Sequence, residues 1–305
     1  MIQRGTLIAG LIVIELAIVG GAVSALQKDQ PAFWPGSLFG AGTFAGPHLI
    51  EGGPHETFLV GARPALTVDI GYADLTIVTR NAPQIDVAVS KSTDFGPLRA
   101  TASFTARKDG ETIRIATAGG SKWSMGDNRM VTVVVPPQTQ VTVVHAGIIT
   151  ANGLRAEASF NSAGRGSITV EDYNAPALHA SSSGRISLHD IVTTRLDVTD
   201  HNSQVEGTGL QVRYGNVETH NGPVTLGFAA SADTLVVVTS HNGTIHAAGL
   251  GPAAAVTSGH KNSDDDDDDD DSSSRTFRIG GGNGHLDVQS HNGDVELIQE
   301  TLTRS

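Results

Sequence analysis

Apolar and polar residues alternate along much of the chain, which is the pattern of β-strands with one buried face. In 66–70 and 85–89 every second residue is Leu, Ile or Val, and the region keeps no helical period. An Asp109-Gly110 pair separates two alternating runs and predicts a tight antiparallel hairpin. We therefore expect residues 62–150 to form an amino-terminal region of antiparallel strands.

The carboxy-terminal half repeats itself about every twenty residues. Each repeat centres on a small turn residue, and the second residue after it is Ile or Val in every copy. The turn residues are Gly166, Gly184, Ser203, Gly222, Gly243 and Gly293, followed by Ile168, Ile186, Val205, Val224, Ile245 and Val295. Ser263 marks a further, degenerate copy. This period predicts a β-solenoid over residues 151–299, with an acidic insert at 263–274, because each coil must stack on its neighbours to bury its apolar face.

Four of these turns share an Asn before the turn residue. The strand alternation in 286–297 puts this Asn on the same face as the core, so we expect it to point inward. Stacked amides could then bond to one another, and the Gly would supply the positive φ that a corner needs. The predicted structural turn ladder consists of Asn202, Asn221, Asn242, Asn292, Gly222, Gly243 and Gly293.

A histidine precedes each of these asparagines and has the opposite parity, so it should face outward. On consecutive coils, His201, His220 and His241 would form an imidazole row with a spacing that could serve a divalent transition metal, with His291 remote from them. The alternative is a solvated turn residue that was repeated when the coil was duplicated. We favour the alternative, because the sequence identifies no supporting carboxylate, and we assign no metal and no cofactor.

The amino terminus carries a long apolar run. Residues 5–26 contain one ionisable group and are long enough to cross a membrane as a helix. Arg4 precedes the run, which favours a cytoplasmic amino terminus and an extracytoplasmic remainder. We favour an anchor over residues 1–26, with a cleaved signal peptide as the alternative. Residues 27–61 are rich in Gly and Pro, which predicts a linker, and we expect residues 300–305 to form a tail.

Composition narrows the possible chemistry. The 305 residues contain no Cys, which excludes disulfides, iron–sulfur clusters and thiol catalysis. The 36 glycines and 5% aromatic residues suit a fold with many tight turns. The net charge is −12, but the run Asp264–Asp271 supplies eight of these charges and lacks the spaced Gly and Asn of a calcium loop. We therefore favour a solvated loop for that run, with weak, nonspecific calcium binding or a negatively charged interaction tag as the alternative, and we expect no nucleic-acid partner.

Catalytic candidates are few. Asp200 and His201 are neighbours on a strand and point to opposite faces, so they cannot form a catalytic pair. Asp197, Glu206 and Glu218 could be presented along one face, as in a polysaccharide lyase or hydrolase of the parallel β-helix type, but their spacing singles out no pair. We expect no enzymatic activity, and this kind of lyase or hydrolase is the alternative.

Over about residues 64–299 the chain resembles the bacterial putative-adhesin β-strand-repeat domains, also called toast-rack domains. The resemblance lies in the openings Leu66-Thr-Val-Asp-Ile-Gly and Leu75-Thr-Ile-Val and in the recurring Thr/Ser-His-Asn-Gly turns. It implies an all-β protein, a β-solenoid flanked by antiparallel strands, and no catalytic residues. Such domains are often exported or membrane-anchored and are associated in some bacteria with envelope-stress systems.

The sequence therefore predicts an all-β fold with one N-terminal transmembrane helix, antiparallel strands and then solenoid coils of about 20 residues. The expected function is non-enzymatic binding or scaffolding at the bacterial cell envelope. We expect an envelope protein or a surface glycan as the partner.

Overall fold

A computed structural model describes residues 48–50, 55–91, 104–117, 129–250 and 273–300. These residues form strands and turns without a helix, which confirms the all-β prediction. None of the described elements is a helix that could span a membrane. The predicted anchor 1–26, most of the linker, the Ser263 copy and the Asp264–Asp271 run lie outside the described residues.

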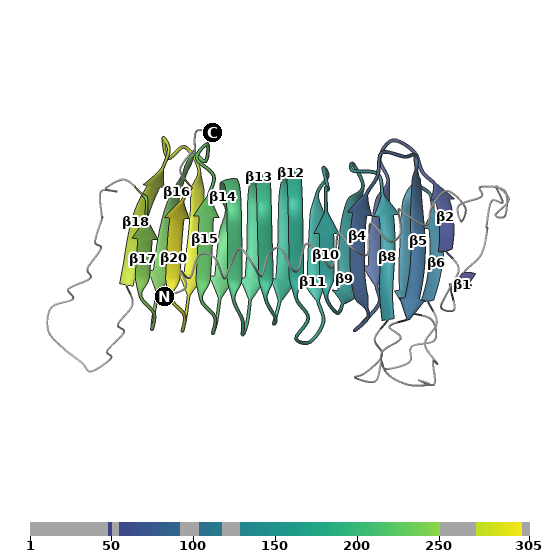
Figure 1. Cartoon of the computed structure of the whole chain (residues 1–305), viewed down its shortest axis with the longest axis horizontal. Coiled ribbons are helices and arrows are strands. Elements are labelled where there is room, and N and C mark those ends of the chain that lie inside the picture. The colour runs from purple at the N-terminus through teal and green to yellow at the C-terminus, as the bar shows by residue number, and fades with distance from the viewer. Residues whose placement is uncertain (1–47, 51–54, 92–103, 118–128, 251–272, 301–305) are drawn as a thin grey trace, which may run out of the picture. The chain divides into compact units, whose positions relative to one another are not determined.

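The strands are arranged in two layers, A and B, which three long strands join. The joining strands are β12 (Ile168–Ser182), β13 (Ile186–Asp200) and β14 (Val205–Thr219). In order along the stack, the other strands of layer A are β2 (His55–Leu59), β5 (Gln84–Lys91), β8 (Arg129–Val135), β4 (Asp74–Thr79), β10 (Ile149–Asn152), β15 (Val224–Phe228), β20 (Val295–Gln299) and β17 (Ile245–Ala248). Those of layer B are β1 (His48–Ile50), β6 (Phe104–Asp109), β7 (Thr112–Thr117), β3 (Ala65–Asp69), β9 (Gln140–Ala146), β11 (Ala158–Ser162), β19 (His285–Ser290), β16 (Thr234–Ser240) and β18 (Ser273–Ile279). Figure 1 shows these strands following one another along one axis of the unit that residues 46–305 form.

The core lies between the two layers. The Ile or Val that follows each turn residue by two positions pairs in register with its counterpart in the neighbouring coil and is at most 7% exposed. These residues are Ile168, Ile186, Val205, Val224, Val295 and Ile245 in spatial order. Burying each such side chain contributes about 1.5–3 kcal/mol to stability. The repeat read from the sequence is therefore the repeat of the solenoid.

The amino-terminal region is not purely antiparallel. The predicted hairpin exists, because β6 and β7 pair antiparallel around Gly110, and β5 pairs antiparallel with both β2 and β8. However, β3 pairs in parallel with β7 and β9, and β4 pairs in parallel with β8 and β10. Alternation of buried and exposed residues is the same in both kinds of pairing, so it could not distinguish them. Parallel coil stacking thus begins at β3 rather than near residue 151.

The coils at the carboxy-terminal end are not stacked in chain order. Strand β19 lies between β14 and β16 in layer B, and β20 lies between β15 and β17 in layer A. Strand β18 then covers the far side of β16 in antiparallel orientation. The last coil of the chain is therefore inserted between two coils that precede it in sequence.

The long strands bend where they pass from layer A to layer B. Asp172 and Asp190 occupy these bends with φ angles of 48° and 54°. Asp tolerates this left-handed conformation better than most residues. In the first bend, Arg155 Nη2 donates to both carboxylate oxygens of Asp172, at 2.8 and 2.7 Å, which holds the corner.

Candidate functional site

The four predicted asparagines form one chain of side-chain hydrogen bonds along the turns. Asn221 Nδ2 donates to Asn202 Oδ1 at 2.9 Å, Asn292 Nδ2 donates to Asn221 Oδ1 at 2.8 Å, and Asn242 Nδ2 donates to Asn292 Oδ1 at 2.8 Å. All four side chains are exposed, so the expected inward direction is wrong. The turn begins at the preceding His and interrupts the strand alternation one residue earlier than we expected.

Another set of polar residues holds the inner side of these turns. Each lies three positions before the turn residue, is at most 2% exposed, and accepts a hydrogen bond from the backbone N–H of that turn residue. The acceptors are Asp200 Oδ2 (2.6 Å), Thr219 Oγ1 (3.3 Å), Ser290 Oγ (3.0 Å) and Ser240 Oγ (3.0 Å). Short polar side chains commonly close turns in this way. Strand alternation predicts that Asp200, Thr219 and Ser240 point inward as polar residues of the corner, and their burial confirms this. Their role in closing the turn has a signal in the sequence, a Ser, Thr or Asp at a constant offset from the turn residue.

The turn glycines are required by close packing and not by φ. None of Gly222, Gly243 and Gly293 has a positive φ, in contrast to the prediction. A Cβ on Gly222 would instead collide with the carbonyl oxygen of Ser203, and one on Gly293 with that of Gly222. A Cβ on Gly243 would likewise meet the carbonyl oxygen of Gly293. Successive coils therefore approach too closely at this corner for a side chain.

Three of the four histidines stack along the turns, in an order that the sequence did not indicate. His291 lies between His220 and His241, with ring centroids 4.9 Å from the first and 4.5 Å from the second. The rings of His220 and His291 are parallel to within 2°. Among the described residues there is no group of three or more His, Asp or Glu that could hold a metal ion. The row is thus a stack of rings along the turn edge.

The three carboxylates considered for catalysis do not all lie in one layer, and none of them pairs in register with another. Asp197 is bound by Arg195 Nε at 2.7 Å and by His179 Nδ1 at 3.0 Å. Glu218 lies on the same layer but pairs in register with Thr199, whereas Asp197 pairs with Asn216. Glu206 lies in the other layer, 3.5 Å from Arg185. Among the described residues no hydrogen bond links these acids, and Asp197 is already engaged by Arg195 and His179.

Asp200, Thr219, Ser290 and Ser240, together with the turns that they close, form a stack that we call the turn column. Asp200 is its one carboxyl. It is 1% exposed, and its Oδ1 has no hydrogen-bond partner among the described residues. Burial raises the pKa of Asp200, although hydrogen bonds from the backbone of Ser203 and His201 act in the opposite direction. Because its side chain is enclosed, it could not reach a substrate at the surface.

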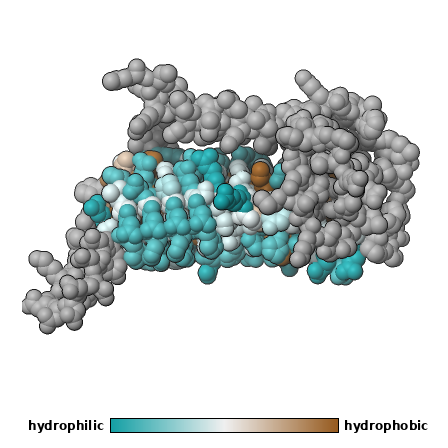
Figure 2. Space-filling model, turned by 90° about the horizontal axis from the view of Figure 1, so that it is seen from below, coloured by the Kyte–Doolittle hydropathy of each residue, from teal (hydrophilic) through white to brown (hydrophobic). Residues whose placement is uncertain are grey.

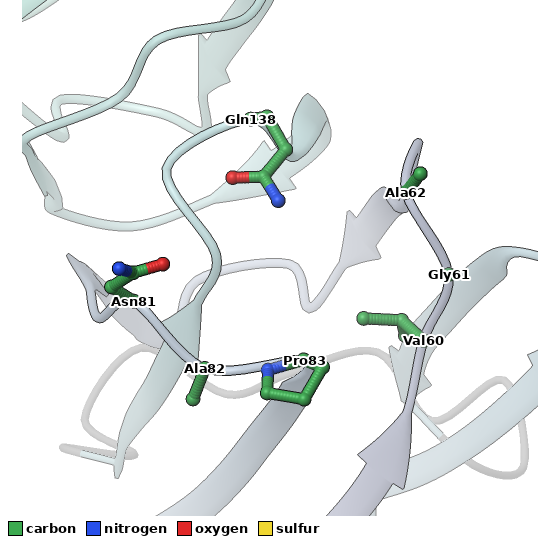
Figure 3. Close-up of a pocket in the computed structure, with 7 residues that line it drawn as sticks. All are labelled: Val60, Gly61, Ala62, Asn81, Ala82, Pro83 and Gln138. Atoms are coloured by element: carbon green, nitrogen blue, oxygen red, sulfur yellow. The ribbon is translucent and has the colours of Figure 1, made fainter.

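One open hollow lies near the amino-terminal end of the described strands. It has a volume of about 330 Å³ and lies among the loops that follow β2, β4 and β8. Figure 3 shows the side-chain amides of Asn81 and Gln138 on one side and Val60 and Gly61 on the other. None of its lining residues is titratable, so it lacks the groups for acid–base catalysis.

The outer surface of layer A carries a row of hydroxyl side chains on adjacent strands. Its members pair in register, alternate with fully buried neighbours and are half-buried themselves. In spatial order this hydroxyl row consists of Thr132, Thr76, Thr150 and Thr169. Strands about 4.8 Å apart give the row a length of about 14 Å. Figure 2 shows that the described part of the surface, seen from below, is largely hydrophilic and regularly ribbed.

The layers, the in-register core and the turn column define a β-solenoid with antiparallel strands at its ends. The family model described as Toastrack DUF4097 matches residues 64–298. The chain belongs to this family, which confirms the toast-rack resemblance.

Several solved structures are similar to the chain at low identity. The "putative adhesin" of Bacteroides fragilis is 10% identical, with a TM-score of 0.45, over 83% of this chain and 97% of that one. A "putative adhesin" of Parabacteroides distasonis is 13% identical, with a TM-score of 0.42, over 82% and 98%. A "putative lipid binding protein" of the same species is 11% identical, with a TM-score of 0.38, over 81% and 96%. No curated protein matches the chain. Because the identities are 10–13% and the TM-scores are 0.38–0.45, these similarities carry no argument about function.

Proposed function

We propose that this protein is a non-enzymatic binding or scaffold protein of the bacterial cell envelope. In this proposal residues 1–26 anchor the chain in the membrane and the solenoid lies outside. The apolar run 5–26, with Arg4 before it, supports the anchor and its orientation. The partner is an envelope protein or a surface glycan.

The hydroxyl row is the observation that carries the binding role. It presents four uncharged donors and acceptors on strands that share one continuous backbone hydrogen-bonding pattern. Such a row is regular, and its length suits an extended partner better than a small substrate. Its strands are fixed by pairing on both sides, so little conformational entropy is lost when a partner binds.

The arrangement of acids gives no support to a lyase or hydrolase. Asp197 is engaged by Arg195 and His179, and Glu206 lies in the other layer. A hydrolytic mechanism needs two carboxyl groups that flank one bond.

Crosslinking capture from intact membranes tests the proposal. We expect Thr150→Arg and Thr169→Arg to reduce partner capture at least tenfold, because each puts a long charged side chain into the hydroxyl row. The matched control is Thr142→Arg, which changes an exposed Thr of layer B to the same residue. Equal capture by all variants and the unchanged protein would reject the hydroxyl row as the binding surface.

Digestion of the captured material distinguishes an envelope protein from a surface glycan. Captured material that is sensitive to protease is expected for an envelope protein. Material that resists protease and is released by glycosidases is expected for a surface glycan. Capture of neither kind would contradict the binding role.

A further inference from the structure

The carboxy-terminal coil occupies a slot in the middle of the solenoid. Strand β19 is hydrogen-bonded to β14 on one side and to β16 on the other, and β20 is likewise bonded to β15 and β17. The inward apolar side chains of this coil are all 0% exposed. They are Leu286, Val288, Val295 and Leu297.

Without this coil, two other coils would face each other across an unfilled gap. The coil ending in β15 and the coil formed by β16 and β17 are adjacent to β19 and β20, and the registers of the described strands pair each of them with the inserted coil and not with one another. The gap would leave unpaired strand edges on both layers, and such edges recruit any strand of matching pattern. A matching strand is present in every copy of this chain.

A short connection brings the last coil into its slot. Ile279 at the end of β18 pairs with Thr234, and His285 at the start of β19 pairs with Leu235, so residues 280–284 cross over the start of β16. Gly280 and Gly282 have φ angles of 60° and 74°, which make the crossing tight.

The end of the crossing is fixed by one carboxylate. Asp233 Oδ1 accepts from the backbone N–H of Asn283 at 3.1 Å, and Oδ2 accepts from Asn283 Nδ2 at 2.6 Å. These bonds lower the pKa of Asp233, so the contact is made by the ionised carboxylate. Asn283 therefore belongs to the docked coil, and residues 280–282 are the hinge.

We propose that residues 283–300 can be exchanged between two copies of this chain, each copy filling the slot of the other. The exchanged coil makes the same strand pairs, apolar contacts and Asp233 bonds, and only the hinge changes conformation. Short hinges that hold a tight conformation favour such exchange, because the hinge can adopt an extended conformation in the exchanged dimer. The resulting dimer would hold two solenoids together through the exchanged coils. This inference does not depend on which partner the solenoids bind.

Single-cysteine variants test the exchange, because the natural chain has no Cys. Thr225 and Glu296 pair in register between β15 and β20, and both alternate with buried neighbours. Thr225→Cys and Glu296→Cys proteins are mixed, unfolded, refolded together at high concentration and oxidised. We expect a mixed disulfide dimer, because these positions meet between different molecules only after exchange.

A second pair measures random crosslinking. Ser187 and Glu206 also pair in register, but they belong to coils that are contiguous in the chain. Ser187→Cys and Glu206→Cys proteins, mixed and treated identically, should give only the background level of dimer. Equal yields from the two mixtures would overturn the proposal.

A hinge variant provides an independent measurement on the protein without Cys. Gly282→Ala disfavours the left-handed conformation and should raise the dimer fraction after refolding about fivefold or more, as measured by light scattering. Gly110→Ala is the matched control, since Gly110 also has a positive φ, has open space around it and lies outside the hinge. A dimer fraction that is the same in both variants would also count against exchange.

Discussion

Asp200 offers the sharpest test of how the turn column is stabilised. Its counterparts in neighbouring coils are Thr219, Ser290 and Ser240, which close the same turn without a charge. Asp200→Ser would keep an acceptor for the Ser203 N–H and remove the buried Oδ1 that lacks a partner among the described residues. An unpaired buried polar atom costs about 1–3 kcal/mol.

The expected gain is smaller than this cost. The carboxylate accepts the Ser203 N–H at 2.6 Å, and a charge-assisted bond contributes more than a neutral one. The hydroxyl of Thr219 adds little at 3.5 Å. We therefore expect Asp200→Ser to increase the free energy of unfolding by about 1 kcal/mol at pH 7.

The effect should depend on pH in a defined direction. Because burial raises the pKa of Asp200 in the folded state above its ordinary value of 3.8, the folded state binds a proton more readily than the unfolded state. This contribution of Asp200 to stability therefore falls as pH rises from the unfolded pKa through the folded pKa. The advantage of Asp200→Ser should be largest at pH 7 and should shrink towards pH 4.

Urea denaturation of both proteins at pH 7 and pH 4 measures this difference. Asp200→Asn is the control, because it removes the charge while nearly keeping the shape. An Asp200→Ser protein that is less stable than the natural one at pH 7, or an advantage that grows on acidification, would refute the reasoning.

Three further predictions concern the same column and the inserted coil. Gly222→Ala should destabilise the fold by about 2 kcal/mol or more, because its Cβ meets the Ser203 carbonyl. Gly110→Ala has open space around it and should cost about 1 kcal/mol for its positive φ. Similar melting temperatures of the two variants would contradict this. Asn292→Ala breaks two exposed amide bonds and should cost only about 0.5–1.5 kcal/mol; a larger loss by thermal denaturation would mean that the amide chain supports the core. Deletion of residues 283–305 should make the coils on both sides of the empty slot sensitive to limited proteolysis, and an unchanged digestion pattern would argue against the insertion.

The register of the coils could be predicted from sequence for a simple physical reason. Every coil needs an apolar side chain at the first inward position after the turn, so Ile168, Ile186 and Val205 mark that position in any copy. The order of the coils could not be predicted in this way. Val295 fits beside Val224 as well as Ile245 would, and the insertion depends on the crossing at residues 280–284, which no periodicity encodes.

The direction of the turn side chains was harder to predict for a different reason. Strand alternation holds only while the backbone is extended, and it ends at Ser290, one residue before the His-Asn-Gly turn begins. The alternation correctly predicts that Ser290 is buried, but carrying it through His291 also put Asn292 inside, whereas the Asn292 side chain is exposed. The asparagines nevertheless bond to one another, because neighbouring coils place equivalent residues side by side.

Membrane-impermeant labelling tests most directly whether the solenoid lies outside the cell membrane, as the proposed role at the envelope requires. Glu218→Cys gives the chain one thiol on an exposed position of layer B. In intact spheroplasts, an impermeant maleimide should label this thiol as fully as it does after lysis. Labelling that occurs only after lysis would contradict an extracytoplasmic solenoid and, with it, the proposed role at the cell envelope.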